Sequence, residues 1–129
     1  MKVKDVMLKK GKFPILTPKT LLKEALVEMV NTKLGLVCIT DSNNKLIGIF
    51  TDGDIRRMLL KNQKPFSAFF VDDIIDHANL NPTTCKDSDS LKESLKLMEE
   101  KGIWDLPVLD GKNNLIGLFH LHQAISKLI

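Results

Sequence analysis

The chain contains two copies of one sequence pattern, and this internal repeat constrains its fold more than any other feature. The segment 41–50 recurs as 110–119, and the same spacing of 69 residues relates 22–29 to 91–98. One spacing that holds over two separate stretches indicates a duplicated structural unit. The chain has 129 residues, so each copy has about 60, a size at which an isolated hydrophobic core is marginal. We therefore expect the two copies to pack together.

We expect each copy to fold as strand, helix, strand, strand, helix, with repeat 1 over residues 1–63 and repeat 2 over residues 64–129. The predicted fold class is α/β (α+β), with two pseudo-symmetric β-α-β-β-α repeats packed together. Helical spacing and short apolar runs place the elements of repeat 1 at residues 15–18, 21–30, 36–39, 46–50 and 54–60. The corresponding elements of repeat 2 are predicted at residues 91–98, 105–109, 115–119 and 121–128.

Local signals add detail to this prediction. Thr20 is expected to be the N-cap of the first helix, and Ser90 begins a capping-box pattern at the equivalent helix of repeat 2. The two middle strands of each repeat are apolar at nearly every position, which is typical of strands covered on both faces. Residues 71–75 resemble residues 3–7 at a spacing of 68, which predicts a lead-in segment before each repeat.

Composition excludes several classes of protein. A hydrophobic content of 43%, a charged content of 27% and a net charge of +3 are typical of a soluble globular protein without a strong nucleic-acid footprint. No apolar run approaches the roughly 20 residues that span a bilayer, and no signal-peptide pattern is visible. Cys38 and Cys85 occupy different positions of the repeat, so we expect reduced thiols rather than a disulfide. These features predict a cytoplasmic protein.

The two copies diverge directly after their shared Gly-x-Phe, and repeat 1 there carries residues suited to a ligand. Its sequence continues as Thr51-Asp52-Gly53-Asp54-Ile55-Arg56-Arg57, where a strand is expected to end and a helix to begin. Helix-start N–H groups favour anions. Thr51 can donate to a phosphate oxygen, Asp54 can accept from ribose hydroxyls, and Arg56 and Arg57 can neutralise a phosphate or carboxylate. The alternative is a simple helix cap, formed by Thr51, Asp52 and Asp54, with solvated arginines.

The repeated pattern, with Leu-Ile-Gly before Thr-x-x-Asp, resembles a tandem pair of cystathionine-β-synthase (CBS) domains, also called a Bateman module. The resemblance covers essentially the whole chain. In that family the Gly-x-x-Thr-x-x-Asp element binds the ribose and phosphate of nucleotides, which implies Gly48, Thr51 and Asp54 here. The family also implies that the base lies against the segment before the first helix and against the second strand. The residues concerned are Leu16, Thr17, Pro18 and Val37.

A closer resemblance is to the C-terminal CBS pair of bacterial D-arabinose 5-phosphate isomerases. It is carried by Gly-Ile-Phe-Thr-Asp-Gly-Asp-Ile-Arg-Arg at 48–57, by Lys33-Leu34-Gly35, and by Gly-x-x-His-x-His at 117–122. Those enzymes begin the pathway to the lipopolysaccharide sugar 3-deoxy-D-manno-octulosonate (Kdo). CBS pairs attached to sugar-phosphate nucleotidyltransferases resemble the Thr-Asp-Gly-Asp-Ile-Arg-Arg part of the first string, at 51–57, as well. Gln123 departs from the usual Asp of the isomerases and argues against a second nucleotide site.

His120 stands in the second copy where repeat 1 has Thr51, and His122 stands where it has Gly53. A metal site needs three or four ligands, and no further cluster of ligating residues is visible. We therefore predict no metal, and expect both histidines to line a polar cleft and to hydrogen-bond an acidic group of a ligand. A divalent-metal enzyme that uses these two residues is the alternative. His77 is expected to be incidental.

These features predict a non-catalytic regulatory module that binds a nucleotide or nucleotide-sugar and has no catalytic residues or catalytic cofactor. The resemblance implies an attached sugar-isomerase domain, with CMP-Kdo as the regulatory ligand. Sensing of AMP or ATP, a nucleotidyltransferase partner and a purely structural oligomerisation role are the alternatives. We also expect a homodimer, formed by apolar helix residues, and no binding to nucleic acid or membrane. The dimer-forming side chains are predicted to be Leu26, Val27, Val30, Leu59 and Leu60.

Overall fold

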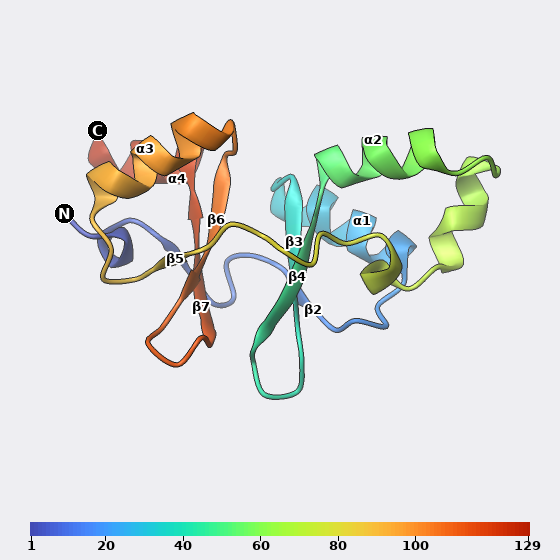
Figure 1. Ribbon diagram of the computed structural model, residues 1–129, viewed down its shortest axis with the longest axis horizontal. Helices are drawn as coiled ribbons and strands as arrows, with labels where there is room; N and C mark the ends of the chain where they lie inside the picture. The colour runs from blue at the N-terminus through green and yellow to red at the C-terminus, as the bar shows by residue number, and fades with distance from the viewer. The chain divides into compact units, whose positions relative to one another are not determined.

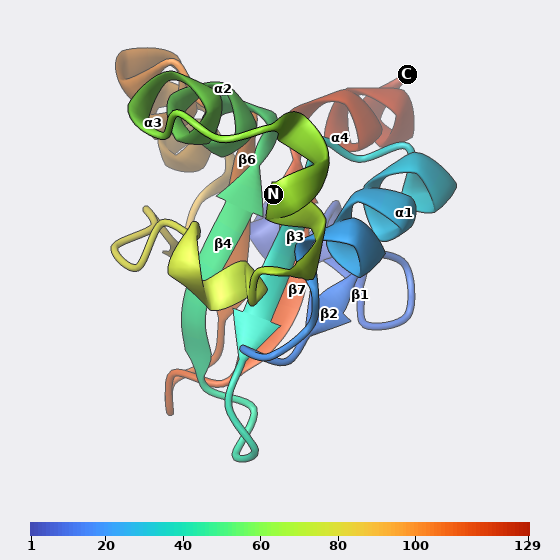
Figure 2. The ribbon, with the colours of Figure 1, turned by 90° about the vertical axis from the view of Figure 1, so that its right-hand side faces the viewer.

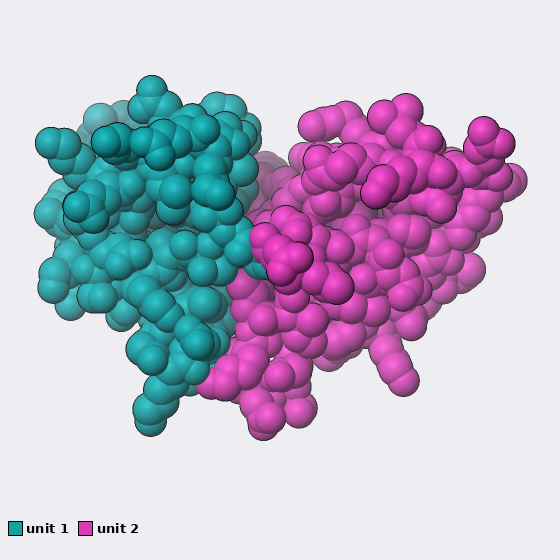
Figure 3. Space-filling model, viewed as in Figure 1, with its two compact units in different colours: residues 1–12, 82–129 teal, residues 13–81 magenta.

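The structure, a computed structural model, describes every residue from 1 to 129, and the chain forms two compact units. Unit 1 consists of residues 1–12 and 82–129, and unit 2 of residues 13–81 (Figures 1 and 3). These units divide the chain differently from the repeat boundary predicted between residues 63 and 64. None of the helices combines the length and the apolar character needed to cross a membrane.

Unit 2 is built on a three-stranded sheet in the order β2-β3-β4, which Figure 2 shows with unit 2 facing the viewer. The central strand β3 pairs parallel with β2 and antiparallel with β4. The strands are β2 (Ile15–Leu16), β3 (Leu36–Thr40) and β4 (Leu46–Thr51). The helices are α1 (Leu22–Thr32), α2 (Asp52–Lys61) and the short 3-10 helices η2 (Phe66–Val71) and η3 (Ile74–Asp76).

Unit 1 has a four-stranded sheet in the order β1-β7-β6-β5. Here β6 pairs parallel with β5 and antiparallel with β7, and β1 adds to the free edge of β7. The strands are β1 (Leu8–Lys9), β5 (Cys85–Lys86), β6 (Asp105–Leu109) and β7 (Leu115–His120). The helices are η1 (Val3–Asp5), α3 (Leu91–Lys101) and α4 (Leu121–Leu128).

The hydrophobic core of unit 2 joins both α-helices to the sheet. α1 presents residues at helical spacing to one face of β3 and β4, and Met58 of α2 packs into the same cluster. Every residue of 36–39 is fully buried, so both faces of β3 are covered, as its continuous apolar sequence predicts. The buried members of this cluster are Leu22, Ala25, Met29, Val37, Ile39, Phe50, Met58, Phe69 and Ile74.

The spacing of 69 residues relates the helices and strands of the two repeats as well as their sequences, which confirms the predicted duplication. α1 and α3, β3 and β6, and β4 and β7 each begin 69 residues apart. The left-handed residue in each hairpin turn follows the same rule, with φ of 63° at Asn44 and 65° at Asn113. The mixed α/β fold of two similar repeats therefore has the predicted form.

The segments that precede the two repeats pack on the opposite repeat. We name residues 1–9 lead-in 1 and residues 72–80 lead-in 2. In unit 1 the amide of Val3 donates to the carbonyl of Asp89 (3.0 Å), and in unit 2 the amide of Ile74 donates to the carbonyl of Thr20 (2.7 Å). Lead-in 1 therefore belongs to the unit that holds the sheet of repeat 2, and lead-in 2 to the unit that holds the sheet of repeat 1.

Each lead-in also pairs with the outer strand of the sheet it joins. Leu8 of β1 lies opposite Leu118 of β7. In unit 2 Asn79 forms the corresponding bridge with Ile49 of β4, with N···O distances of 2.8 and 3.0 Å. This exchange of lead-ins explains why the compact units are not the sequence repeats.

The prediction that residues 71–75 correspond to residues 3–7 is wrong by three residues. The matching hydrogen bonds align Val3 with Ile74, a spacing of 71, and both side chains are fully buried. Val71 instead belongs to η2 and is exposed. The similarity of the two short strings reflects composition, whereas the spacing of 71 reflects the contacts that the lead-ins make.

The helix starts follow the prediction only in part. Ser90 is the N-cap of α3, and its hydroxyl accepts from the amide of Glu93 (3.3 Å). Thr20 does not cap α1, which begins at Leu22 without a side-chain cap. The Thr20 hydroxyl is used by the amide of Thr17 (3.2 Å), so it stabilises the preceding turn. α2 begins at Asp52, two residues earlier than predicted.

Lead-in 2 passes close to the backbone of Gly48. A substitution of Gly48 therefore tests whether lead-in 2 packs on the sheet of repeat 1. A Cβ atom at Gly48 would lie 2.7 Å from the backbone oxygen of Asn79. We predict that Gly48→Ala destabilises the protein by about 1–3 kcal/mol in urea unfolding, because the backbone must shift. The matched control is Gly111→Ala, where the added atom meets nothing within 4 Å. Equal effects of both substitutions would contradict the packing described here.

Candidate functional site

The junction between β4 and α2 is closed by a reciprocal cap between Thr51 and Asp54. The amide of Thr51 donates to Asp54 Oδ2 (2.9 Å), and the amide of Asp54 donates to Thr51 Oγ1 (3.3 Å). The Thr51 hydroxyl also donates to the same carboxylate oxygen (3.1 Å). Asp54 is only 6% exposed. The two residues singled out in the sequence are therefore neighbours, and in this state they satisfy each other.

Arg57 completes this arrangement from the next turn of α2. Its Nη2 donates to Asp54 Oδ1 (2.6 Å), while 63% of its side chain remains exposed. Both Nη atoms lie 3.4 Å from the point that a Cβ on Gly53 would occupy. The guanidinium group thus covers the space above Gly53.

The helix start has fewer free N–H groups than its sequence suggests. The amide of Asp52 donates to the carbonyl of Gly35 (3.1 Å), and that of Asp54 is used by Thr51. The Asp52 side chain lies against Gly35, in a separate groove of about 340 Å³ between α1 and α2. Asp52 therefore faces the groove, whereas Asp54 faces a different, more polar pocket.

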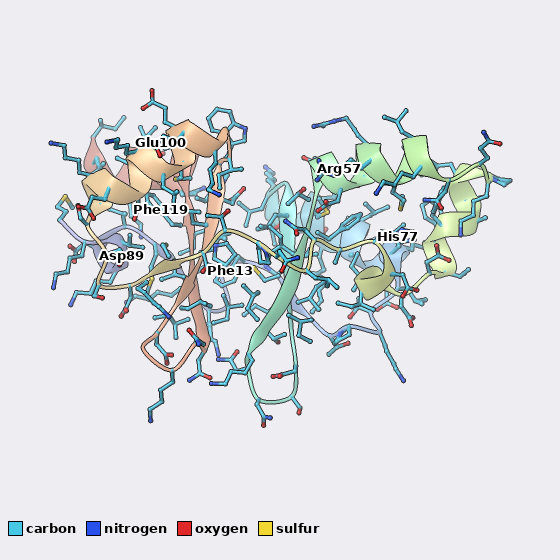
Figure 4. All side chains as sticks on the ribbon, in the orientation of Figure 1. Phe13, Arg57, His77, Asp89, Glu100 and Phe119 are labelled. Carbon is cyan, nitrogen blue, oxygen red and sulfur yellow. The ribbon has the colours of Figure 1, made fainter.

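This polar pocket has a volume of about 550 Å³ and lies between α2 and the end of lead-in 2. Figure 4 labels Arg57 on α2 and His77 at the end of η3, which contribute to its two sides. The sequence predicted two of its residues, Asp54 and Arg57. The full lining is Asp54, Arg57, Met58, Lys61, Asn62, Asp76, His77, Ala78 and Asn79.

The pocket residues that sequence reasoning missed had two different signals. Lys61 follows Arg57 by four residues on the same helix. The helical spacing therefore predicts that both side chains lie on one face of α2. His77 and Asn79 required the spacing of 71, which makes them equivalent in position to Val6 and Leu8 of lead-in 1. Polar residues thus replace apolar ones in one lead-in only. That difference becomes visible once the register of the lead-ins is known.

His77 is held in the pocket wall by a charged cluster. Asp72 Oδ2 lies 2.7 Å from His77 Nε2 and accepts from Lys64 Nζ at 2.9 Å. These hydrogen bonds, that of His77 first, hold the pKa of Asp72 below its ordinary value. Phe69 stacks edge-on against the imidazole, and Lys64 lies over the same phenyl ring. His77 is therefore held in place at the wall of the pocket by Asp72 and Phe69.

The other residues predicted for ligand binding in repeat 1 lie elsewhere in unit 2. Val37 is fully buried in the core, and Leu16 packs against it. Thr17 is hydrogen-bonded to Thr20, and the carbonyl of Pro18 accepts from the amide of Ile75. The remaining two are Gly48, which faces Asn79, and Arg56, which is exposed on α2. None of these six residues lines the polar pocket.

His120 and His122 belong to unit 1 and have different environments. His120 Nδ1 lies 2.6 Å from Asp105 Oδ1, its cross-strand partner on β6. The hydrogen bond to Asp105 raises the pKa of His120, and burial opposes this effect. His122 is exposed on α4. No group of three or more His, Cys, Asp or Glu side chains is arranged to hold a metal ion.

The comparisons with known proteins identify the family. The sequence model of the CBS domain matches residues 3–61 and again residues 71–129. The chain therefore belongs to the CBS domain family and carries two copies of the domain.

Relatives with curated sequences are longer than this chain. It is 36% identical over 127 residues to an uncharacterised protein of Helicobacter pylori, which covers 98% of this chain and 37% of that protein. It is 32% identical over 125 residues to the arabinose 5-phosphate isomerase KdsD of Pseudomonas aeruginosa, covering 97% and 37%. The chain thus spans 37% of the length of these relatives.

Among solved structures, the crystal structure of CBSX2 in complex with AMP superimposes with a TM-score of 0.84. Its sequence is 25% identical, and the match covers 98% of this chain and 95% of that one. CBSX2 is a CBS-pair protein from Arabidopsis thaliana. The fold of a CBS pair is therefore established for this chain.

The Asp105–His120 pair should make the stability of unit 1 depend on pH. Because the folded-state pKa of His120 is raised, its contribution is fully present below the ordinary histidine value of about 6.5. The contribution is lost as the pH rises through the folded-state value. We predict that urea unfolding shows this loss in the wild-type protein and that Asp105→Asn removes it. An unchanged NMR titration of His120 in the variant would contradict the assignment.

Proposed function

We propose that this CBS pair is a non-catalytic regulatory module that binds a nucleotide or nucleotide-sugar, with its principal site in unit 2. The observation that carries this proposal is the Asp54–Arg57 pair at the wall of the polar 550 Å³ pocket. A volume of several hundred Å³ is typical of small-molecule sites. The AMP complex of CBSX2, which has the same fold, supports a nucleotide as the class of ligand.

To bind a ligand at this site, Asp54 and Arg57 must exchange their bond to each other for bonds to the ligand. The Asp54 carboxylate has acceptor oxygens only, so it suits the paired hydroxyls of a ribose. Arg57 now neutralises Asp54, but its exposed side chain can turn to a phosphate and bind it with two donors. Thr51 can then donate its hydroxyl to the ligand. A single acidic residue is thereby released from an internal ion pair and used for recognition.

The partner that we propose is an attached sugar-phosphate isomerase domain, which the CBS pair controls or assembles. The identity to KdsD of Pseudomonas aeruginosa and the length of that relative support this. CMP-Kdo, the activated sugar of the Kdo pathway, is the feedback ligand that fits such a parent, acting in the cytoplasm where nucleotide-sugars are made. An adenine nucleotide is the second candidate, which the AMP complex of CBSX2 favours.

Replacement of Asp54 tests the site directly. Asp54→Ala removes charge-assisted hydrogen bonds worth roughly 1.5–3 kcal/mol each, so affinity for AMP or CMP should fall about ten- to a hundred-fold. On the wild-type protein, the 2′-deoxy analogue should bind more weakly than the ribonucleotide. Titration calorimetry measures both effects, and it should give one principal site per chain, since repeat 2 has His120 and Gln123 in place of Thr51 and Asp54.

Loss of a cap must be separated from loss of the site. Ser90→Ala is the matched control, because it removes the N-cap of α3 in unit 1 and costs about 1 kcal/mol of stability. It should leave nucleotide affinity unchanged. If folded Asp54→Ala binds ribonucleotide and deoxyribonucleotide as the wild type does, Asp54 is only a helix cap and the proposed site is wrong.

We also propose that the chain forms a homodimer through apolar side chains of α1 and α2. Four of the five residues predicted for this contact are exposed, with Val30 at 75% and Leu60 at 87%. A specific dimer buries on the order of 1,600 Å² in total. Light scattering should therefore give twice the 14.5 kDa chain mass.

The dimer interface can be tested by introducing charge. The double variant Val30→Asp, Leu60→Asp should be monomeric at tens of micromolar, because two carboxylates oppose apolar burial. Val71→Asp is the matched control, since Val71 is 73% exposed but lies on η2. A wild-type protein that is already monomeric would refute the proposal.

A further inference from the structure

We propose that Lys61 binds a second anionic group of the ligand, beyond the phosphate that Arg57 binds, so that the polar pocket prefers nucleotides with two separated anionic groups. This class includes nucleoside diphosphates, whose second anion is a phosphate, and nucleotide-linked sugar acids, whose second anion is a carboxylate. The inference rests on the proposed function, because it names the class of ligand for the same site.

The first argument is the alignment of three charged residues on α2. Asp54, Arg57 and Lys61 are separated by three and four residues, a spacing that places side chains on one face of a helix. All three line the polar pocket. At a rise of about 1.5 Å per residue, Arg57 lies about 4.5 Å and Lys61 about 10.5 Å along the helix from Asp54. A ligand with its ribose at Asp54 and its phosphate at Arg57 therefore meets Lys61 next.

The second argument is the pairing of these charges. Asp54 and Arg57 form a salt bridge with each other (2.6 Å), whereas Lys61 takes part in none. The Lys61 ammonium group can therefore bind an anion without first leaving another partner. An ammonium group is a compact charge with three donors, so it binds phosphate and carboxylate oxygens alike.

The third argument concerns the opposite wall of the pocket, which carries a charge of the other sign. Asp76 of η3 lines the pocket there, and its carboxylate also takes part in no salt bridge. Because like charges repel, Asp76 lowers the affinity for a second anion, whereas Lys61 raises it. Changes at these two residues should therefore shift the same preference in opposite directions.

The decisive measurement is the ratio of two affinities, that of CDP to CMP and that of ADP to AMP. Titration calorimetry on the whole chain with EDTA present keeps the terminal phosphate free of divalent cations. We expect the wild type to prefer the diphosphates about two- to fivefold, the range for an exposed pair of opposite charges. In Lys61→Gln the ratio should fall towards one, and in Asp76→Asn it should rise.

The matched control removes a lysine from the same place in another helix. Lys61 lies in the last turn of α2, where a lysine also stabilises the helix through its dipole. Lys101 lies in the last turn of α3 and does not line the polar pocket. Lys101→Gln removes the same charge and the same dipole interaction, so it should keep the wild-type ratio.

A second ligand distinguishes the two sources of the anion. CMP-N-acetylneuraminic acid carries a sugar carboxylate in place of the terminal phosphate of CDP. If Lys61 binds a carboxylate as well, Lys61→Gln should weaken this ligand relative to CMP. If Lys61 binds only a terminal phosphate, the variant should change the ratios for CDP and ADP alone.

Three results would contradict the role of Lys61 and leave the proposed function standing. They are a wild-type ratio near one for both diphosphates and for the CMP-linked sugar acid, a preference that Lys61→Gln leaves unchanged, and a preference that Asp76→Asn lowers. Binding of AMP or CMP in the same titrations shows that the site itself is intact. If none of the five nucleotides binds the wild type, the proposed function fails and this inference with it.

Discussion

The exchange of lead-ins is the constraint on which the rest of this structure depends. Each β-hairpin offers an edge strand with unpaired backbone groups, and a lead-in from elsewhere in the chain covers that edge. Gly48 and Gly117 mark the two crossings, because a side chain at either position would collide with the passing segment. A glycine that the family resemblance assigns to ligand binding thus has a packing reason in this structure. The same crossing brings His77 and Asn79 to the face of α2.

The site described here is occupied by its own side chains. Asp54 accepts hydrogen bonds from Thr51 and Arg57, and no buried polar side-chain atom lacks a partner. A ligand that binds Asp54 must therefore replace these internal contacts. At the site proposed above, a molecule with only a phosphate or only a diol would replace only part of this arrangement.

The sequence was sufficient for those features that depend on local patterns. The repeat spacing, the apolar strands and the Ser90 cap each rest on contacts between residues near one another in the chain or related by the duplication. It also placed Thr51, Asp54 and Arg57 in one cluster, because they share a helix start. The polar pocket could be predicted only in part. Its second wall comes from lead-in 2, and the register of that segment is set by backbone bonds to Thr20 and Pro18 that no side-chain pattern records.

The errors have a common physical origin. Thr20 has the chemistry of an N-cap, yet its hydroxyl is used one turn earlier, by Thr17. Residues 71–75 have the composition of a lead-in, yet η2 occupies the first of them. The Thr20 hydroxyl is thus bonded to a neighbouring backbone amide, and Val71 is part of a neighbouring helix. For Thr20 the competing bond is a local one between side chain and backbone, of the kind that competes with helix capping.

The exchanged lead-ins also set the order in which the chain can fold during synthesis. Unit 2 is continuous in sequence, so all its residues are available once residue 81 has left the ribosome. Unit 1 joins the two ends of the chain, and Lys127 reaches back to the carbonyl of Met7. Residues 1–12 therefore reach their native contacts only after residues 82–129 have been made. Unit 2 can thus complete its contacts before unit 1 does, although residues 1–12 are made before any residue of unit 2.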